Sequence, residues 1–176
     1  MIRLVTVCTA NLCRSPLAEH ALRAAAAGRA QVQVRSTGVS VRPGSVPPAD
    51  WCEVAGSLGF DLRSHRSSEA DLEDADLVIG MTADHLRRLA LTRPTLLGRL
   101  VTLRSAVTRL ESLGLGPAES PEDLRARFVG TQRSIDILRA DDHLDVADPY
   151  RRPRREQERI ANEIIDLAHR FAEVFA

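Results

Sequence analysis

Apolar runs alternate with amphipathic stretches along the chain. Four short apolar or alternating runs predict strands: IRLVTV (2–7), QVQVRS (31–36), ADLVIGM (75–81) and GRLVTL (98–103). Helical spacing of apolar residues predicts helices over 15–28, 51–59, 82–91, 120–128 and 155–175. Strands that alternate with helices form βαβ units. We therefore expect one α/β domain over 1–176, a four-stranded twisted parallel sheet with helices on both faces.

Composition narrows the class of protein further. The chain has 24 basic and 24 acidic residues and a hydrophobic fraction of 44%, which argues against disorder. All the basic residues are arginine, and a net charge of zero gives no reason to expect a nucleic-acid partner. No apolar run is long enough for a membrane span, and MIRLVTV is too short for a signal peptide. Three cysteines without an export signal predict free thiols and a cytoplasmic location.

The first strand ends at a cysteine. Parallel sheets bind ligands beyond the carboxyl ends of their strands, and Cys8 lies at such an end. Five residues (9–13) separate it from Arg14, where the next helix is expected to begin. A loop of this size that leads into a helix can direct several amide groups at one oxyanion, and the arginine adds a bidentate fork. The same field stabilises a thiolate, so Cys8 is a candidate nucleophile.

The segment VCTANLCRSP resembles the phosphate-binding loop of the low-molecular-weight protein tyrosine phosphatases, whose pattern is V-C-x-G-N-x-C-R-S-P. That family also carries Asp-Pro-Tyr near its C-terminus, and this chain has Asp148, Pro149 and Tyr150 before its last predicted helix. The segments GFDLRSHR and ADLVIGMTADH resemble family segments in matching order. The resemblance covers nearly the whole chain, although 104–146 is longer than usual.

The resemblance implies three catalytic residues. Cys8 attacks phosphorus, Arg14 binds the phosphate and stabilises the transition state, and Asp148 acts as general acid and then general base. No metal and no cofactor are expected, because the loop amides and the arginine supply the positive charge.

The resemblance also implies supporting roles. Ser15 donates a hydrogen bond to the Cys8 sulfur, Asn11 holds the shape of the loop, and His65 supports it from the second shell of residues. The residues expected to contact the substrate are Thr9, Ala10, Asn11, Leu12, Cys13, Ser15 and Tyr150. The expected partner is a phosphotyrosine protein or a small phosphate ester, and inorganic phosphate or other oxyanions should inhibit.

Two positions depart from the family pattern. Ala10 replaces the loop glycine, which would cost about 1 kcal/mol if that position requires positive φ. The wall near Arg42 and Pro43 lacks the aromatic residue that often stands there, which weakens the case for stacking on a phosphotyrosine ring.

Other functions stay open. An arsenate reductase would use the same loop, but related enzymes need a further cysteine pair near the third strand, and only Cys13 and Cys52 remain here. A phosphoarginine phosphatase would carry threonine in place of Leu12. A non-catalytic phosphate-binding module is the fourth alternative.

Several residues carry a second interpretation. Cys13 is either inert or a redox partner of Cys8, and Cys52 is expected to be an ordinary helix residue. The acidic group Asp141, Asp142, His143 and Asp145 suits a solvated loop better than a metal site. The run RRPRREQER (151–159) is an exposed helix start or a surface for acidic phosphoproteins.

Overall fold

The computed structural model of the chain describes residues 1–28, 32–113, 120–128, 144–173 and 175. A four-stranded parallel sheet lies at its centre, in the order β2-β1-β3-β4. The strands are β1 (Ile2–Cys8), β2 (Val32–Gly38), β3 (Leu77–Gly80) and β4 (Leu100–Thr102). The sheet predicted from the sequence is confirmed, including its four strands and their parallel direction.

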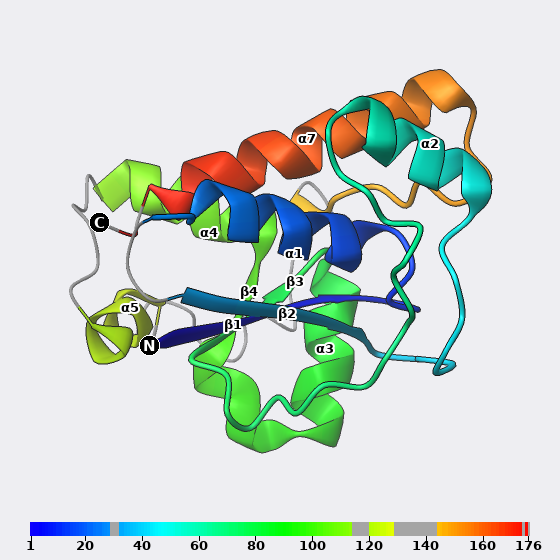
Figure 1. The fold of residues 1–176 in the computed structure, drawn as a ribbon. Helices are drawn as coiled ribbons and strands as arrows, with labels where there is room; N and C mark the ends of the chain where they lie inside the picture. Colours follow the sequence, from blue (N-terminus) through cyan, green and yellow to red (C-terminus); the bar gives the residue numbers. More distant parts are fainter. Residues whose placement is uncertain (29–31, 114–119, 129–143, 174, 176) are drawn as a thin grey trace.

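Helices cover both faces of this sheet (Figure 1). One face carries α1 (Arg14–Ala25), α2 (Ala49–Ser57), α4 (Leu103–Leu113) and α7 (Arg154–Ala172). The other face carries α3 (Ala83–Thr92) and the 3-10 helix η1 (Pro94–Arg99), and α5 (Pro121–Phe128) lies near the amino terminus of β1. Within the described residues, no helix combines the length and the apolar character that crossing a membrane requires.

Strand β1 supplies side chains to both cores. Leu4 and Cys8 pack with the α1 and α7 side of the sheet, whereas Val5 and Val7 pack with the α3 side. Because successive side chains of a strand point to opposite faces, a strand buried on both faces is a continuous apolar run. This geometry places Cys8 on the same side of the sheet as α1.

The region after β3 differs most from the prediction. Strand β4 is shorter than the predicted run 98–103, because α4 begins at Leu103 and η1 precedes the strand. Thr102 accepts a hydrogen bond from the amide of Ser105 (3.2 Å), which fixes the first turn of α4. Neither α4 nor η1 was predicted, and residues 129–143 of the long segment lie outside the described residues.

Candidate active site

The loop between β1 and α1 lies at the carboxyl edge of the sheet (Figure 1). The residues directly after β2 continue the pairing of β2 with β1 into this loop. The Val39 amide donates to the Cys8 carbonyl and the Ser40 amide to the Thr9 carbonyl, each at 2.9 Å. Gly38 is required by this close approach, because a Cβ there would lie 2.4 Å from the Thr9 carbonyl oxygen. The loop is therefore held directly against the end of β2.

Asn11 organises the interior of the loop. Its side-chain amide donates to the hydroxyls of Ser15 (3.1 Å) and Ser36 (2.9 Å), and its side-chain oxygen accepts from the Ser68 amide (3.1 Å). His65 Nε2 lies 2.9 Å from the Asn11 carbonyl oxygen, so the expected support of the loop by His65 has a direct contact. Three other parts of the chain thus converge on one loop residue.

The positive-φ position of the loop is Asn11, with φ 57°, and not Ala10. Asparagine tolerates the left-handed region better than most residues. Alanine in place of the family's glycine therefore causes no left-handed strain at position 10, and the cost considered from the sequence does not arise.

Ser15 connects this network to Cys8. Its hydroxyl lies 3.1 Å from the Cys8 sulfur and 3.0 Å from the Thr37 carbonyl oxygen. Because Asn11 donates to the Ser15 oxygen, the single O–H of Ser15 points away from Asn11 and has two acceptors within reach, the Cys8 sulfur and the Thr37 carbonyl oxygen. The negative charge of a thiolate favours donation to the sulfur. Such a bond stabilises the ionised form of the thiol.

A cavity of about 350 Å³ opens above the loop. Its lining consists of Cys8, Thr9, Ala10, Leu12, Cys13, Arg14, Asp148 and Tyr150. Asn11 and Ser15 were expected to contact the substrate, but they do not line this cavity. Their side chains are fully buried behind the loop. Tyr150 is half exposed at the cavity, as expected for a residue at the entrance.

Arg14 connects the start of the chain with its last third. Its Nη1 donates to the Val146 carbonyl oxygen at 3.1 Å, and its Nη2 lies 3.2 Å from Asp148 Oδ2. The guanidinium is buried, whereas the Asp148 side chain is 55% exposed. A cationic group and a carboxyl group therefore face each other at the cavity that holds Cys8.

The segment that carries Asp148 is anchored to the end of β3. Val146 donates its amide to the Met81 carbonyl (2.8 Å), and Asp145 accepts from the Ala83 amide (2.7 Å) at the start of α3. Asp145 thus has a structural role, whereas Asp141, Asp142 and His143 lie outside the described residues. Among the residues that are described, no three His, Cys, Asp or Glu side chains form a group that could hold a metal ion.

His85 is a site residue that the sequence analysis missed. Its Nδ1 accepts from the Thr82 amide (3.1 Å), which leaves the proton on Nε2, 3.0 Å from the Thr9 hydroxyl. Burial, followed by the charge of Arg14, lowers the pKa of His85 to about 4, so the ring is neutral at pH 7. The Thr82 and His85 spacing at a helix start, directly after a buried strand, is the signal that could have revealed it.

All three cysteines are free thiols. Burial raises the pKa of Cys13, and the nearby Cys8 and Asp148 raise it further. Cys13 therefore stays protonated at neutral pH and is a weak nucleophile. Cys52 is half buried on α2 and lines a separate cavity with Val46 and Asp61.

Comparisons with known proteins agree with this geometry. The family model "Low molecular weight phosphotyrosine protein phosphatase" matches residues 3–116. The low molecular weight protein-tyrosine-phosphatase Etp of Escherichia coli K12 is 31% identical over 99 residues, which cover 54% of this chain and 65% of Etp. The match thus spans slightly less than two thirds of that relative's length.

Arginine phosphatases are also among the similar proteins. The protein-arginine-phosphatase of Bacillus subtilis strain 168 is 32% identical over 108 residues, which cover 60% of this chain and 72% of that protein. The solved YwlE arginine phosphatase from Geobacillus stearothermophilus aligns with a TM-score of 0.72 and 26% identity, over 98% of this chain and 92% of that one. The family model alone matches well over half of the chain, and the chain belongs to the low molecular weight phosphotyrosine protein phosphatase family.

Proposed function

We propose that this protein hydrolyses phosphate monoesters through a phosphocysteine on Cys8, and that its substrates are phosphotyrosine proteins. The observation that carries the proposal is the Ser15 hydroxyl, which lies 3.1 Å from a cysteine sulfur that lines the same cavity as Arg14 and Asp148. A stabilised thiolate, an anion-binding arginine and a carboxyl group are the three parts that this reaction requires.

In the first step, the Cys8 thiolate attacks phosphorus and an S–P bond forms while the P–O bond to the leaving group breaks. Arg14 and the loop amides stabilise the equatorial phosphoryl oxygens. Asp148 gives its proton to the leaving oxygen, which matters because a phenol has a pKa of about 10 and its unprotonated form is therefore a poor leaving group. Acid catalysis of this kind contributes roughly 10² to 10⁴ in rate.

In the second step, the Asp148 carboxylate takes a proton from water, and the water oxygen attacks phosphorus. The S–P bond breaks, inorganic phosphate leaves, and Cys8 returns as a thiolate. The carboxylic acid is regenerated, so the cycle needs no metal and no redox partner. Inorganic phosphate and other oxyanions are therefore expected to act as competitive inhibitors.

Leu12 supports phosphotyrosine over phosphoarginine. The similar proteins include both kinds of phosphatase, so the choice depends on this chain's own residues. Leu12 lines the cavity with an apolar side chain, which suits a flat aromatic ring but offers no acceptor to a guanidinium. Phosphoarginine remains the second candidate, because proteins named arginine phosphatases match this chain at similar identity. We further propose a reducing compartment such as the cytoplasm, which suits three free thiols.

Hydrolysis of para-nitrophenyl phosphate, a phosphotyrosine peptide and a phosphoarginine peptide by wild type, Cys8→Ser and Asp148→Asn tests the proposal. We expect Cys8→Ser to abolish turnover. Asp148→Asn should lower kcat on phosphotyrosine by about 10² or more, and less on substrates whose leaving group is a weak base. Turnover by Cys8→Ser within tenfold of wild type would refute the cysteine mechanism. Faster cleavage of phosphoarginine than of phosphotyrosine would reverse the substrate assignment.

A further inference from the structure

Three segments around the loop contain arginine but no acidic residue of their own. Segments 39–48, 62–68 and 149–155 contain one, two and four arginines, and none contains aspartate or glutamate. The chain as a whole has equal numbers of acidic and basic residues. Carboxylates flank two of these segments directly, at Asp61, Glu69, Asp148 and Glu156, so the excess of positive charge depends on which arginines lack an ion pair.

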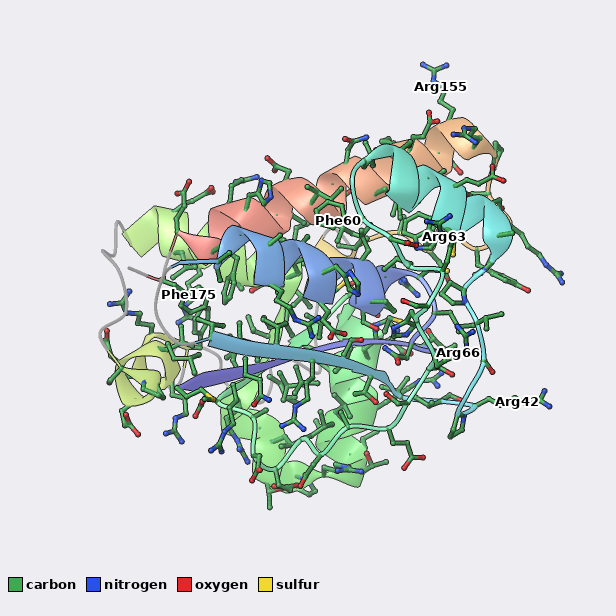
Figure 2. The ribbon with its side chains drawn as sticks, viewed as in Figure 1. Arg42, Phe60, Arg63, Arg66, Arg155 and Phe175 are labelled. Carbon is green, nitrogen blue, oxygen red and sulfur yellow. The ribbon has the colours of Figure 1, made fainter. Side chains whose placement is uncertain are left out.

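These segments meet at one end of the molecule. The Ser67 hydroxyl donates to the Arg42 carbonyl (2.6 Å), and the Gly44 amide donates to the Ser67 carbonyl (2.8 Å), which joins the first two segments. Both are tied to the loop through the contact of His65 with Asn11. Figure 2 shows Arg42, Arg63 and Arg66 at the end of the molecule where β1 leads into the loop.

The third segment reaches the cavity that holds Cys8 through Tyr150, which lines it. The Arg151 guanidinium lies over the Tyr150 ring, 5.1 Å from its centroid. Arg151 has φ 57°, and it is the second non-glycine residue with positive φ in the described part of the chain, after Asn11. Left-handed backbone at non-glycine residues concentrates at functional sites.

Ion pairing separates the seven arginines into two groups. Arg63 pairs with Asp61, and Arg152 pairs with Glu156. Arg154 pairs with Glu53 and Glu158. The remaining four have no carboxylate partner among the described residues, and they are Arg42, Arg66, Arg151 and Arg155. Arg155 projects away from the loop at the start of α7 (Figure 2), which leaves three exposed arginines without an ion pair among the described residues. One of them, Arg66, donates to the carbonyl oxygens of Arg63 (3.1 Å) and His65 (2.8 Å) through Nη1, and its Nη2 has no hydrogen-bond partner in the described part of the chain.

We propose that Arg42, Arg66 and Arg151, the arginine rim, bind carboxylates on either side of the phosphorylated residue, so that the preferred substrates are acidic phosphopeptide segments of proteins. This inference rests on the proposed phosphatase function and specifies its substrate class. Guanidinium groups match carboxylates in a planar, bidentate geometry. Exposed contacts of this kind are individually weak, so the three together are expected to change kcat/KM by roughly tenfold.

The same features favour an acidic protein segment over a nucleic acid. Single-stranded nucleic acids are bound on a basic groove with aromatic side chains on which bases stack. Here aromatic residues are 3% of the chain, and the aromatic side chain at the site, Tyr150, already has Arg151 over its ring. Three separate arginines on the segments that surround the loop suit discrete carboxylates better than a continuous phosphate backbone.

The test compares two phosphotyrosine peptides that differ only in having Asp and Glu, or Asn and Gln, around the phosphotyrosine. Wild type should show about tenfold higher kcat/KM for the acidic peptide at low salt, mainly through KM, and the difference should shrink at high salt. R42Q/R66Q should lose at least two thirds of this preference. Arg151 is left unchanged, because its backbone conformation also shapes Tyr150.

The matched control is R35Q/R93Q, which removes the same charge from β2 and from the end of α3, where neither arginine has a carboxylate partner among the described residues. It should keep the wild-type preference. Binding of labelled peptides to the Cys8→Ser protein, with and without R42Q/R66Q, measures the same preference without turnover. If the wild-type protein does not hydrolyse para-nitrophenyl phosphate, the proposed phosphatase function is refuted. The binding measurement would still test whether the arginine rim prefers acidic peptides.

Three results would overturn the inference. The first is equal kcat/KM and equal Kd for the acidic and neutral peptides at low salt. The second is an equal loss of preference in R42Q/R66Q and in R35Q/R93Q. The third is displacement of the acidic peptide by a single-stranded DNA oligonucleotide of the same charge at equal concentration, which would indicate a general polyanion surface.

Discussion

Asn11 combines a left-handed backbone with a side chain that serves three polar partners. In this backbone conformation the buried amide contacts Ser15, Ser36 and Ser68 at once. A residue that satisfies one requirement and not the other should disturb the loop in a characteristic way.

Comparison of Asn11→Gly with Asn11→Ala separates the two properties. Both variants remove the hydrogen bonds, but glycine accepts positive φ, whereas alanine adds a cost of roughly 1–2 kcal/mol. We expect both to lower kcat/KM strongly and Asn11→Ala to unfold at lower urea concentration than Asn11→Gly. Urea unfolding and para-nitrophenyl phosphate kinetics provide the measurements. Equal stability of the two variants would show that φ at this position is not under constraint.

For single residues, the sequence predicted which residues form the site better than it predicted where their side chains point. Spacing and resemblance placed Cys8 and Arg14 at the loop, and both line the cavity. Spacing could not show that the Asn11 and Ser15 side chains turn behind the loop, because side-chain directions in an irregular segment follow no period. Spacing also gives no backbone angles in an irregular segment, so strain was considered at Ala10, whereas the residue with positive φ is Asn11.

At the scale of elements, α3 is more than a cover for the sheet. Its N-terminal turn holds Thr82 and His85 in a reciprocal capping arrangement, and His85 extends this arrangement to the Thr9 hydroxyl. The neutral ring is required, because Nδ1 acts as an acceptor toward the Thr82 amide. Protonation of His85 would therefore disturb the helix start and the loop together.

His85 predicts a pH dependence of stability. Burial, followed by the Arg14 charge, lowers its pKa to about 4, against about 6.5 in the unfolded chain. Between these values the unfolded chain binds a proton that the folded chain does not, so stability falls as pH decreases from about 6.5 to 4 and then levels off. Between pH 7 and pH 5, wild type should lose about 2 kcal/mol more than His85→Gln.

Urea unfolding at the two pH values measures this difference. His169→Gln is the matched control, because His169 is exposed near the end of α7 and should retain the wild-type loss. Parallel pH profiles for wild type and His85→Gln would contradict the assignment of a neutral, proton-resisting imidazole to this position.

The elements themselves were predicted unevenly, and for identifiable reasons. Helix α7 has a strong helical period, and β1 is a continuous apolar run, so both were found. Helix α4 was missed although Leu103, Ala106 and Val107 share a helical face and are fully buried. No glycine or proline separates it from β4, so the change from strand to helix carries no boundary signal.

For the whole molecule, the site depends on two distant parts of the chain. Arg14 and Val146 are 132 residues apart and share a hydrogen bond, and the Val146 amide also donates to the Met81 carbonyl directly after β3. The match to the family model ends at residue 116, so it does not reach Asp148. Periodicity could not have brought these parts together, because nothing in the order of helices and strands specifies where the last loop crosses the sheet. The Asp-Pro-Tyr resemblance alone predicted it.

Arg14 should therefore contribute to stability as well as to anion binding. Arg14→Ala leaves the buried Val146 carbonyl without its donor, at a cost of about 1–3 kcal/mol. Arg14→Lys keeps the charge but cannot reach both Val146 and Asp148 with a single ammonium. We expect kcat to fall by roughly 10² to 10³ in both variants, and stability to fall more in Arg14→Ala.

Addition of phosphate distinguishes the two roles. At about ten times its Kd, phosphate should stabilise wild type by about 1.4 kcal/mol and raise its Tm. Cys8→Ser should keep this increase, since the loop amides and Arg14 remain, whereas Arg14→Ala should lose it at the same phosphate concentration. A full phosphate-induced rise of Tm in Arg14→Ala would show that the arginine only joins the two parts of the chain, and that the loop amides alone bind the anion.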